Sequence, residues 1–128
     1  MDFELTDDQR RLREAARGLA AAFTDEYWAE CDAKGEFPWE FYRAFADGGW
    51  LGIAIPEAYG GGGLGLLEAS LLMEEIAASG AGMNGCSTMH LTIFGLNTIV
   101  KHGSARLREE ILPSAADGSL HVCFGVTE

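Results

Sequence analysis

The side chains best suited to metal binding or nucleophilic chemistry in this sequence are three histidines and three cysteines. They are His90, His102, His121, Cys31, Cys86 and Cys123. Zinc ligands occur at short, regular spacings, and these six residues do not form such a pattern. The serines also lack the glycine-flanked turn that exposes a catalytic serine. We therefore expect no metal site and no catalytic residue of these types.

A run of glycines and a pair of glutamates are the other patterns that suggest chemistry. Residues 60–65 satisfy the G-x-G-x-x-G pattern of a dinucleotide-binding turn. Pro56 interrupts the strand that such a turn requires, and a second helix stands where the next parallel strand should follow. A surface loop is the better interpretation. Glu74 and Glu75 point about 100° apart on a helix, so we expect them to be solvated and not to act as paired acids.

The composition is that of one acidic globular domain. Its 128 residues, 48% of them hydrophobic, fit a single core. A formal net charge of −11 repels polyphosphates and argues against nucleic acid as a partner. No apolar stretch approaches the roughly 18 to 20 residues of a membrane-spanning helix, and the start lacks the features of a secretory signal. The expected location is the cytoplasm.

A series of predicted helices carries these residues, and the first begins at a capping box. Thr6 and Gln9 have the spacing that satisfies free backbone N–H groups at a helix start. Apolar residues then recur at helical spacing from Leu12 to Phe23. The opposite face carries Arg10, Arg13, Glu14 and Arg17. We expect this face to be solvated, with pairs inside the helix that contribute about 0.2–0.5 kcal/mol each.

An aromatic segment follows this helix. Residues 25–36 predict a short acidic helix, and Pro38 suits the first turn of the next helix. Phe37, Phe41 and Phe45 fall four residues apart. This spacing favours packing into the core over an exposed stacking platform.

The second half of the chain predicts three further helices. Residues 51–56 predict a short extended run, and residues 66–79 predict an amphipathic helix. Residues 84–102 are nearly uncharged, which predicts a helix that is buried on most sides in the middle of a bundle. On that helix, His90 is expected as a hydrogen-bonded core histidine. Ser104 is suited to cap a last short helix that runs to Leu112.

The final eight residues predict a strand. Polar and apolar side chains alternate over residues 121–128, with the β-branched and aromatic enrichment of strands. One strand without a hairpin partner cannot satisfy its backbone groups or bury a face. We therefore interpret the chain as one domain of a larger protein.

Three segments in the right order resemble the acyl-CoA dehydrogenase family. They are residues 49–61 (GWLGIAIPEAYGG), residues 102–104 (HGS) leading to 111–113 (ILP), and residues 124–128 (FGVTE). The resemblance extends over essentially the whole chain from Thr6 onward. It implies an all-α orthogonal helical bundle of about five to six helices in residues 1–119. Residues 120–128 would then be one C-terminal β-strand, the start of a middle β-barrel domain that is truncated here.

The resemblance also implies a chemistry. The family uses FAD to remove two hydrogens from the α and β carbons of an acyl-CoA thioester. A glutamate base takes the α proton, and N5 of the flavin takes the β hydride. Because that glutamate lies in the family's C-terminal domain, the resemblance implies no catalytic residue in this chain and no turnover by the chain alone.

Two groups of site residues follow from the resemblance. The implied flavin contacts are Phe124, Gly125, Val126, Thr127 and Glu128. The implied lining of the acyl-chain tunnel is Ser87, His90, Leu91 and Phe94, on the nearly uncharged helix. The implied partners are an acyl-CoA, an electron-transferring flavoprotein or similar acceptor, and further copies of the complete protein in a homo-oligomer. The alternative is a non-catalytic helical module for interaction or oligomerisation.

Overall fold

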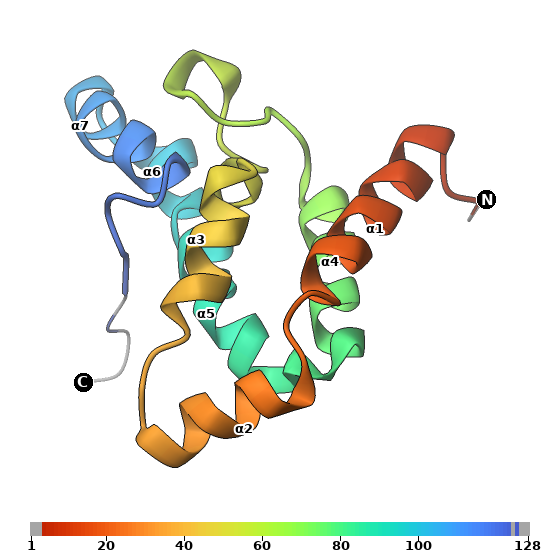
Figure 1. Cartoon of the computed structure of the whole chain (residues 1–128). Coiled ribbons are helices and arrows are strands. Elements are labelled where there is room, and N and C mark those ends of the chain that lie inside the picture. Colours follow the sequence, from red (N-terminus) through yellow and green to blue (C-terminus); the bar gives the residue numbers. More distant parts are fainter. Residues whose placement is uncertain (1–3, 124, 126–128) are drawn as a thin grey trace.

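All regular structure in the described part of the chain is helical. The computed structural model describes residues 4–123 and Gly125. Its α-helices are α1 (Asp7–Ala20), α2 (Asp25–Lys34), α3 (Trp39–Asp47), α4 (Leu66–Ile76), α5 (Gly82–Gly95), α6 (Asn97–His102) and α7 (Ala105–Ala116) (Figure 1). Shorter helical turns are η1 (Trp50–Gly52), η2 (Glu57–Tyr59) and η3 (Ala77–Ala81). The predicted all-α class is confirmed for these residues.

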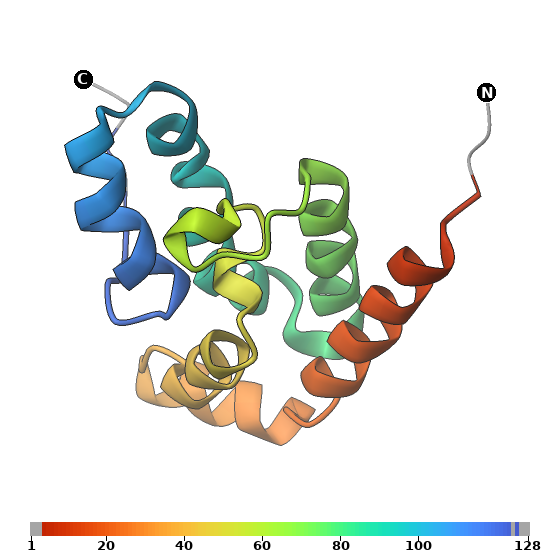
Figure 2. The ribbon, with the colours of Figure 1, turned by 90° about the horizontal axis from the view of Figure 1, so that it is seen from above.

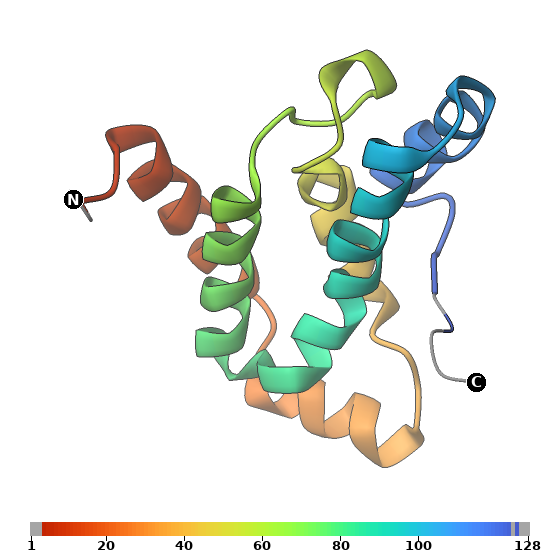
Figure 3. The same ribbon diagram turned by 180° about the vertical axis from the view of Figure 1, so that it is seen from behind.

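Helices α4 and α5 lie side by side and are joined by the bend η3, which rests on α2 (Figure 3). α2 runs across the ends of this pair (Figures 1 and 3). α1 packs along α4 on one side of the molecule, whereas α6 and α7 lie on the other side (Figure 2). α5 therefore has neighbours on several sides, but α1 does not cover it.

The predicted start of α1 is confirmed at the level of single hydrogen bonds. The Gln9 backbone N–H donates to Thr6 Oγ1 over 3.2 Å, and the Thr6 N–H donates to Gln9 Oε1 over 3.0 Å. The Gln9 amide also donates to Glu68 on α4 over 2.8 Å. This residue pair therefore begins α1 and also ties it to α4.

The bend between α4 and α5 depends on glycine. Gly80 and Gly82 have φ values of +86° and +51°, in the left-handed region that side chains with a Cβ rarely adopt. At Gly85 an added Cβ would lie 2.6 Å from Ala81 Cβ and 2.9 Å from Ile76 Cγ2. The absence of a side chain there lets the start of α5 approach the end of α4.

The main core draws on α1 to α5, and its aromatic part lies on α2 and α3. Phe41 and Phe45 are fully buried, and Phe37 packs against the same cluster. The ring centroids of Trp28 and Phe41 lie 4.9 Å apart, and those of Phe41 and Phe45 lie 4.6 Å apart. The predicted core role of the phenylalanine repeat is therefore confirmed.

A second, smaller apolar cluster holds α7 against the segment before η2. Its buried members are Ile55, Leu96, Leu112, Ala115 and Ala116. This cluster places the C-terminal end of α7, and so residues 117–123, beside the main core.

Two predicted elements differ from the structure. Residues 51–56 do not form an extended run, because the chain makes the 3-10 turn η1 and then further turns up to Pro56. Apolar runs this short do not distinguish a strand from a buried turn. Residues 84–102 form two helices, since α5 ends at Gly95 and α6 begins at Asn97, with Leu96 between them. Gly95 and Asn97 are both weak helix formers, which suits an interruption at this point.

The C-terminal strand that was predicted for residues 121–128 is not seen. Residues 121–123 and Gly125 form no strand, and Phe124 and residues 126–128 lie outside the described residues. A strand is stabilised by ladder hydrogen bonds to a partner strand, and the described residues contain no such partner.

One charged residue was also placed wrongly. Glu75 is only 3% exposed, whereas both Glu74 and Glu75 were expected to be solvated. Glu75 accepts hydrogen bonds from Arg13 and Arg17 of α1, over 2.5 Å and 2.8 Å. The basic face of α1 is therefore partly an interhelical contact and not simply a solvated surface.

Among the described residues, no helix is both long and apolar enough to cross a bilayer.

Candidate functional site

The four residues implied as tunnel lining share one face of α5. His90 and Leu91 each lie three or four residues from both Ser87 and Phe94, so the four side chains share one side of the helix. Ser87 and Phe94 are exposed, and His90 and Leu91 are partly exposed. The opposite face, which carries Gly85, Thr88, Met89, Thr92 and Ile93, is buried.

This outward face of α5 is apolar for a solvent-facing surface. Phe94 is 36% exposed, and Met83, one turn before Ser87, is 78% exposed. α5 carries no aspartate, glutamate, lysine or arginine. The prediction that this helix is buried on most sides is therefore wrong for its outer face, and that face is suited to contact with an apolar group.

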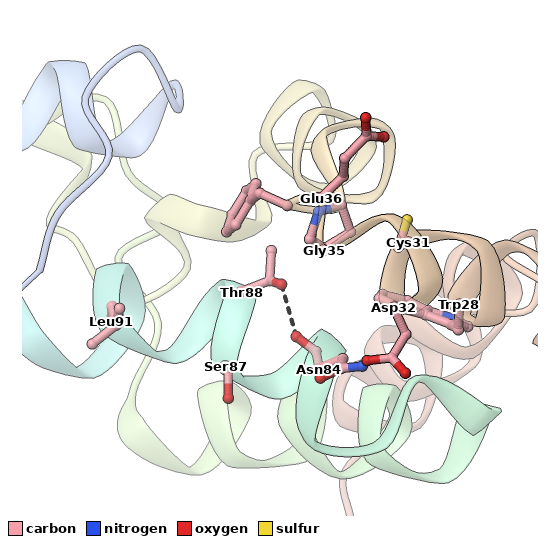
Figure 4. Close-up of a pocket in the computed structure, with 11 residues that line it drawn as sticks. Trp28, Cys31, Asp32, Gly35, Glu36, Asn84, Ser87, Thr88 and Leu91 are labelled. Carbon is pink, nitrogen blue, oxygen red and sulfur yellow. Dashed lines mark hydrogen bonds between the residues drawn. The ribbon is translucent and has the colours of Figure 1, made fainter.

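A groove of about 490 Å³ lies beside this face, between α2 and α5. The residues that line it are Trp28, Cys31, Asp32, Gly35, Glu36, Phe37, Pro38, Asn84, Ser87, Thr88 and Leu91 (Figure 4). Ser87 and Leu91 therefore belong both to the outer face of α5 and to the groove, whereas His90 and Phe94 lie outside it.

Some polar groups of the groove are buried inside it, and the charged ones are exposed to solvent. Deep in the groove, the Thr88 hydroxyl donates to the Asn84 carbonyl over 2.7 Å. Trp28 Nε1 is buried and has no hydrogen-bond partner in the described part of the chain. Asp32 and Glu36 are exposed. Asp32 on α2 and Asn84 on α5 extend toward one another (Figure 4).

The α2 wall of the groove is fixed by a sharp corner. α2 ends at Gly35, whose φ of +63° is a left-handed cap that turns the chain toward Phe37 and Pro38. The Phe41 N–H donates to Tyr27 Oη over 3.3 Å, which joins the start of α3 to α2. Burial raises the pKa of the Tyr27 phenol, so it stays protonated at neutral pH.

Cys86 on α5 is a poor candidate for a nucleophile. Cys86 Sγ lies 3.7 Å from the Met73 carbonyl oxygen, between α4 and α5. Burial raises the pKa of Cys86, which disfavours the reactive thiolate. No group of three or more metal-ligating side chains is brought together within residues 4–123 and Gly125.

The segment that leads to the implied flavin contacts is held at three points. The Leu120 N–H donates to the Ser114 carbonyl over 2.8 Å. The His121 ring lies 5.0 Å from the ring centroids of both Phe37 and Tyr42. Val122 packs against the second apolar cluster. The chain therefore reaches Cys123 along a defined path.

Of the implied flavin contacts, only Gly125 lies within the described residues. An added Cβ at Gly125 would meet no atom within 4 Å. Open space around this backbone is compatible with the close approach of a flat ring. Phe124, Val126, Thr127 and Glu128 are outside the part of the chain that the structure describes.

From the sequence, two of the residues that line this groove are expected at a binding site, Ser87 and Leu91, and none of those that α2 contributes. Nothing in the spacing of Trp28, Cys31 and Asp32 shows that α2 crosses the end of α5. The available signal was the Gly35–Pro38 turn, which had to reverse the chain and bring Phe37 back toward the core. The groove is thus a tertiary feature that local patterns do not contain.

The comparisons with known proteins agree on one family. The family described as "Acyl-CoA dehydrogenase, N-terminal domain" matches residues 6–119. "Acyl-CoA dehydrogenase FadE12" of Mycobacterium tuberculosis is 36% identical over 96% of this chain and 31% of that protein. "Isovaleryl-CoA dehydrogenase, mitochondrial" of Pongo abelii is 38% identical over 97% of this chain and 30% of that protein.

A solved structure gives the same result at the level of the fold. A chain in "Electron transferring flavoprotein of Acidaminococcus fermentans: Towards a mechanism of flavin-based electron bifurcation" superposes with a TM-score of 0.82 and 28% identity. The match covers 95% of the present chain and 32% of that chain. The present chain thus spans about a third of the length of the relatives it matches.

Proposed function

Because this chain belongs to the acyl-CoA dehydrogenase family, as its N-terminal domain, we propose that it forms one wall of the acyl-binding cavity in a flavin-dependent acyl-CoA dehydrogenase. The observation that carries this proposal is the uncharged, solvent-facing side of α5. An alkyl chain placed there covers apolar surface and leaves no charged group without water.

Four residues of α5 have defined roles in this proposal. Leu91 and Phe94 provide apolar contact to the acyl chain. On the same face, Ser87 lies one turn before Leu91, and His90 is the residue next to Leu91. Ligand pockets commonly combine a mostly apolar lining with a few polar groups that fix orientation. This face of α5 has that composition.

The flavin would be held by residues 124–128, through their backbone groups and the Thr127 hydroxyl. Bound there, FAD supplies the acceptor for the hydride that leaves the β carbon of the acyl group. The support for this assignment is the resemblance of residues 124–128 to the flavin-contacting segment of the family. The part played by this chain is to hold and orient, and the contacts of His121 and Val122 fix the direction in which residues 120–123 leave α7.

The general base lies outside this chain in our proposal. α5 carries no carboxylate, and Glu75, the buried one, is occupied by two arginines. The chain alone is therefore inactive. Residues 1–119 form the helical domain and residues 120–128 begin the β-barrel domain of the complete protein. That protein uses an acyl-CoA as substrate, passes electrons to an electron-transferring flavoprotein or similar acceptor, and forms a homo-oligomer.

The test uses the complete polypeptide that contains this chain, purified with its flavin. Anaerobic addition of a saturated acyl-CoA is expected to bleach the visible flavin band and to yield the enoyl-CoA. If the purified complete protein contains no flavin and oxidises no acyl-CoA, the proposal is wrong, and a non-catalytic helical module is the better account.

The role of α5 is tested by Leu91→Asp in the same protein. A carboxylate on this face would have to be desolvated beside the alkyl chain, so kcat/KM should fall by at least about tenfold while flavin content is unchanged. Leu107→Asp on α7 is the control, because Leu107 is also a solvent-accessible helical leucine, 39% exposed, and lies on neither α5 nor the groove. Equal kinetics for the two variants would exclude α5 from the cavity.

A further inference from the structure

We propose that an aromatic clasp holds His121 and thereby positions the segment that contacts the flavin, which makes His121 a positioning residue for the hydride transfer. The clasp consists of the side chains of Phe37, Trp39 and Tyr42. This inference rests on the function proposed above. It gives residues outside the flavin contacts a role in setting the geometry of the flavin.

The first argument is the path of the chain after α7, which is set by a glycine turn. Gly118 has a φ of +78°, and an added Cβ there would lie 2.6 Å from Ala46 Cβ and 3.0 Å from Leu51 Cδ1. A residue with a Cβ rarely adopts this φ and would not fit so closely against α3. The Ser119 N–H donates to Asp117 Oδ1 over 2.8 Å, which closes the turn. The chain that leaves α7 therefore runs beside α3 (Figure 1).

The second argument is the arrangement of rings around His121. Its ring centroid lies 5.0 Å from that of Phe37, 6.1 Å from that of Trp39 and 5.0 Å from that of Tyr42. The interplanar angles with Phe37 and Trp39 are 84° and 69°, the edge-to-face geometry that aromatic pairs prefer. His121 thus makes three ring contacts although it is exposed to solvent.

The third argument is that the clasp is a fixed part of the helical domain. The ring centroids of Phe37 and Trp39 lie 4.5 Å apart, and each lies 5.9 Å from that of Tyr42. Tyr42 is only 2% exposed. Burial raises the pKa of its phenol, and the Thr92 hydroxyl of α5 lies close enough to oppose that rise. The clasp is therefore anchored beside α5, the helix that we assign to the acyl cavity.

The fourth argument is the short distance along the chain from the clasp to the flavin contacts. These contacts begin at Phe124, three residues after His121. An extended chain spans at most about 3.6 Å per residue, so this tether is at most about 11 Å long. A misplacement of about 1 Å at a reacting centre can cost about a hundredfold in rate. A change in the position of His121 should therefore affect the chemical step.

The role of His121 is tested with His121→Ala in the complete protein with its flavin bound. Because α5 and the clasp itself stay in place, kcat should fall at least about threefold while KM for the acyl-CoA changes by less than about twofold. Release of the flavin, followed by its fluorescence, should be about threefold to tenfold faster. His121→Phe keeps a ring in the clasp, so it should bring kcat and the release rate to within about twofold of the wild type. His102→Ala, on α6 and outside the clasp, is the control and should match the wild type.

Three results would overturn the assignment of His121. The first is a His121→Ala variant whose kcat and flavin release equal those of the wild type. The second is a His121→Phe variant that is as impaired as His121→Ala, because ring contacts would then not position the segment. The third is a loss of kcat that accompanies a lowered urea midpoint of unfolding, because His121 would then stabilise the fold and not the geometry of the flavin.

Trp39→Ala tests the clasp from its other side. Trp39 is 48% exposed, so its removal leaves the buried core intact. Each single variant should speed flavin release. The double variant with His121→Ala should exceed the faster single variant by less than about twofold, because both substitutions remove the same contact. If the two effects multiply, the residues act independently, which would contradict a shared clasp.

These outcomes separate the clasp from the function on which it rests. If the wild-type complete protein holds no flavin and oxidises no acyl-CoA, the proposed function fails. If the wild type holds flavin and oxidises acyl-CoAs but His121→Ala behaves like the wild type, only the assignment of the clasp fails.

Discussion

At the scale of single residues, the contact between Glu75 and two arginines is the clearest case of a role that spacing does not reveal. The sequence predicts that both Glu74 and Glu75 are solvated, because consecutive residues on a helix point about 100° apart. Its partners Arg13 and Arg17 are 62 and 58 residues away in sequence. Only the packing of α1 on α4 makes Glu75 a buried member of an ion-pair network.

Replacement of Glu75 by Gln should destabilise the chain by about 1–3 kcal/mol. The change leaves Arg13 and Arg17 without their shared carboxylate, and loss of one partner of a buried pair is costly. Arg17 stays 63% exposed and can recover water, which keeps the cost at the lower end of that class. Urea unfolding of the wild type and of the Glu75→Gln variant measures the difference in their free energies of unfolding. Glu74→Gln, at a mostly exposed position, should change stability by less than about 0.5 kcal/mol.

The same contact predicts a dependence on pH. The hydrogen bond from Arg17, together with that from Arg13, lowers the pKa of Glu75 below its ordinary value of 4.5, against the opposing effect of burial. Its stabilisation is therefore fully present above about pH 4.5 and is lost as the pH falls through the lower pKa of the folded state. The stability gap between wild type and Glu75→Gln should be constant near neutral pH and should shrink in acid. A gap that widens in acid would contradict this ion-pair assignment.

At the scale of elements, local signals predicted where helices begin and end better than how they pack. The capping box at Thr6 is a local feature and acts as predicted, and the short helix predicted for residues 25–36 ends at a left-handed glycine, Gly35. The extended run predicted for residues 51–56 failed, because η1 is stabilised by burial of Leu51 and Gly52 against other elements. The single helix predicted for residues 84–102 failed at Leu96, which is buried in the second cluster.

Two helical glycines should respond to alanine in opposite directions. Gly85→Ala places a methyl group against Ala81 and Ile76 where α4 and α5 approach, so it should destabilise the chain by about 1–2 kcal/mol. Gly18→Ala in α1 meets no atom within 4 Å and should stabilise by about 0.5–1 kcal/mol through helix propensity. Thermal or urea unfolding gives both values. Changes of the same sign would show that the close approach at Gly85 is not tight.

At the scale of the whole molecule, the fold class was predictable and the site was predictable only in part. Periodicity placed Ser87, His90, Leu91 and Phe94 on one helix, but it did not show that their face is turned outward. The groove needs α2 to cross the end of α5, and that arrangement follows from Phe37 and Trp28 packing into the aromatic core. α2 and α5 are separated by about fifty residues in the sequence, so no local pattern predicts that they meet.

The apolar outer face of α5 contrasts with the acidic composition of the chain, whose net charge is −11. Acidic residues occur on α1, α2, α3, α4 and α7, whereas α5, which carries Met83, Leu91 and Phe94, has none. In the proposed complete protein, this face meets the substrate and the neighbouring domains. The same distribution predicts that acyl chains bind to α5 and not to α1 or α7.

The most direct test of this account is photo-crosslinking of the complete protein with an acyl-CoA that carries a diazirine in its acyl chain. After irradiation, mass spectrometry maps the modified residues. The account predicts adducts on the outer face of α5, at Leu91 and Phe94, that disappear when an excess of unmodified acyl-CoA competes. Adducts that avoid α5, or adducts on α5 that persist under competition, would contradict the claim that this helix lines the acyl cavity.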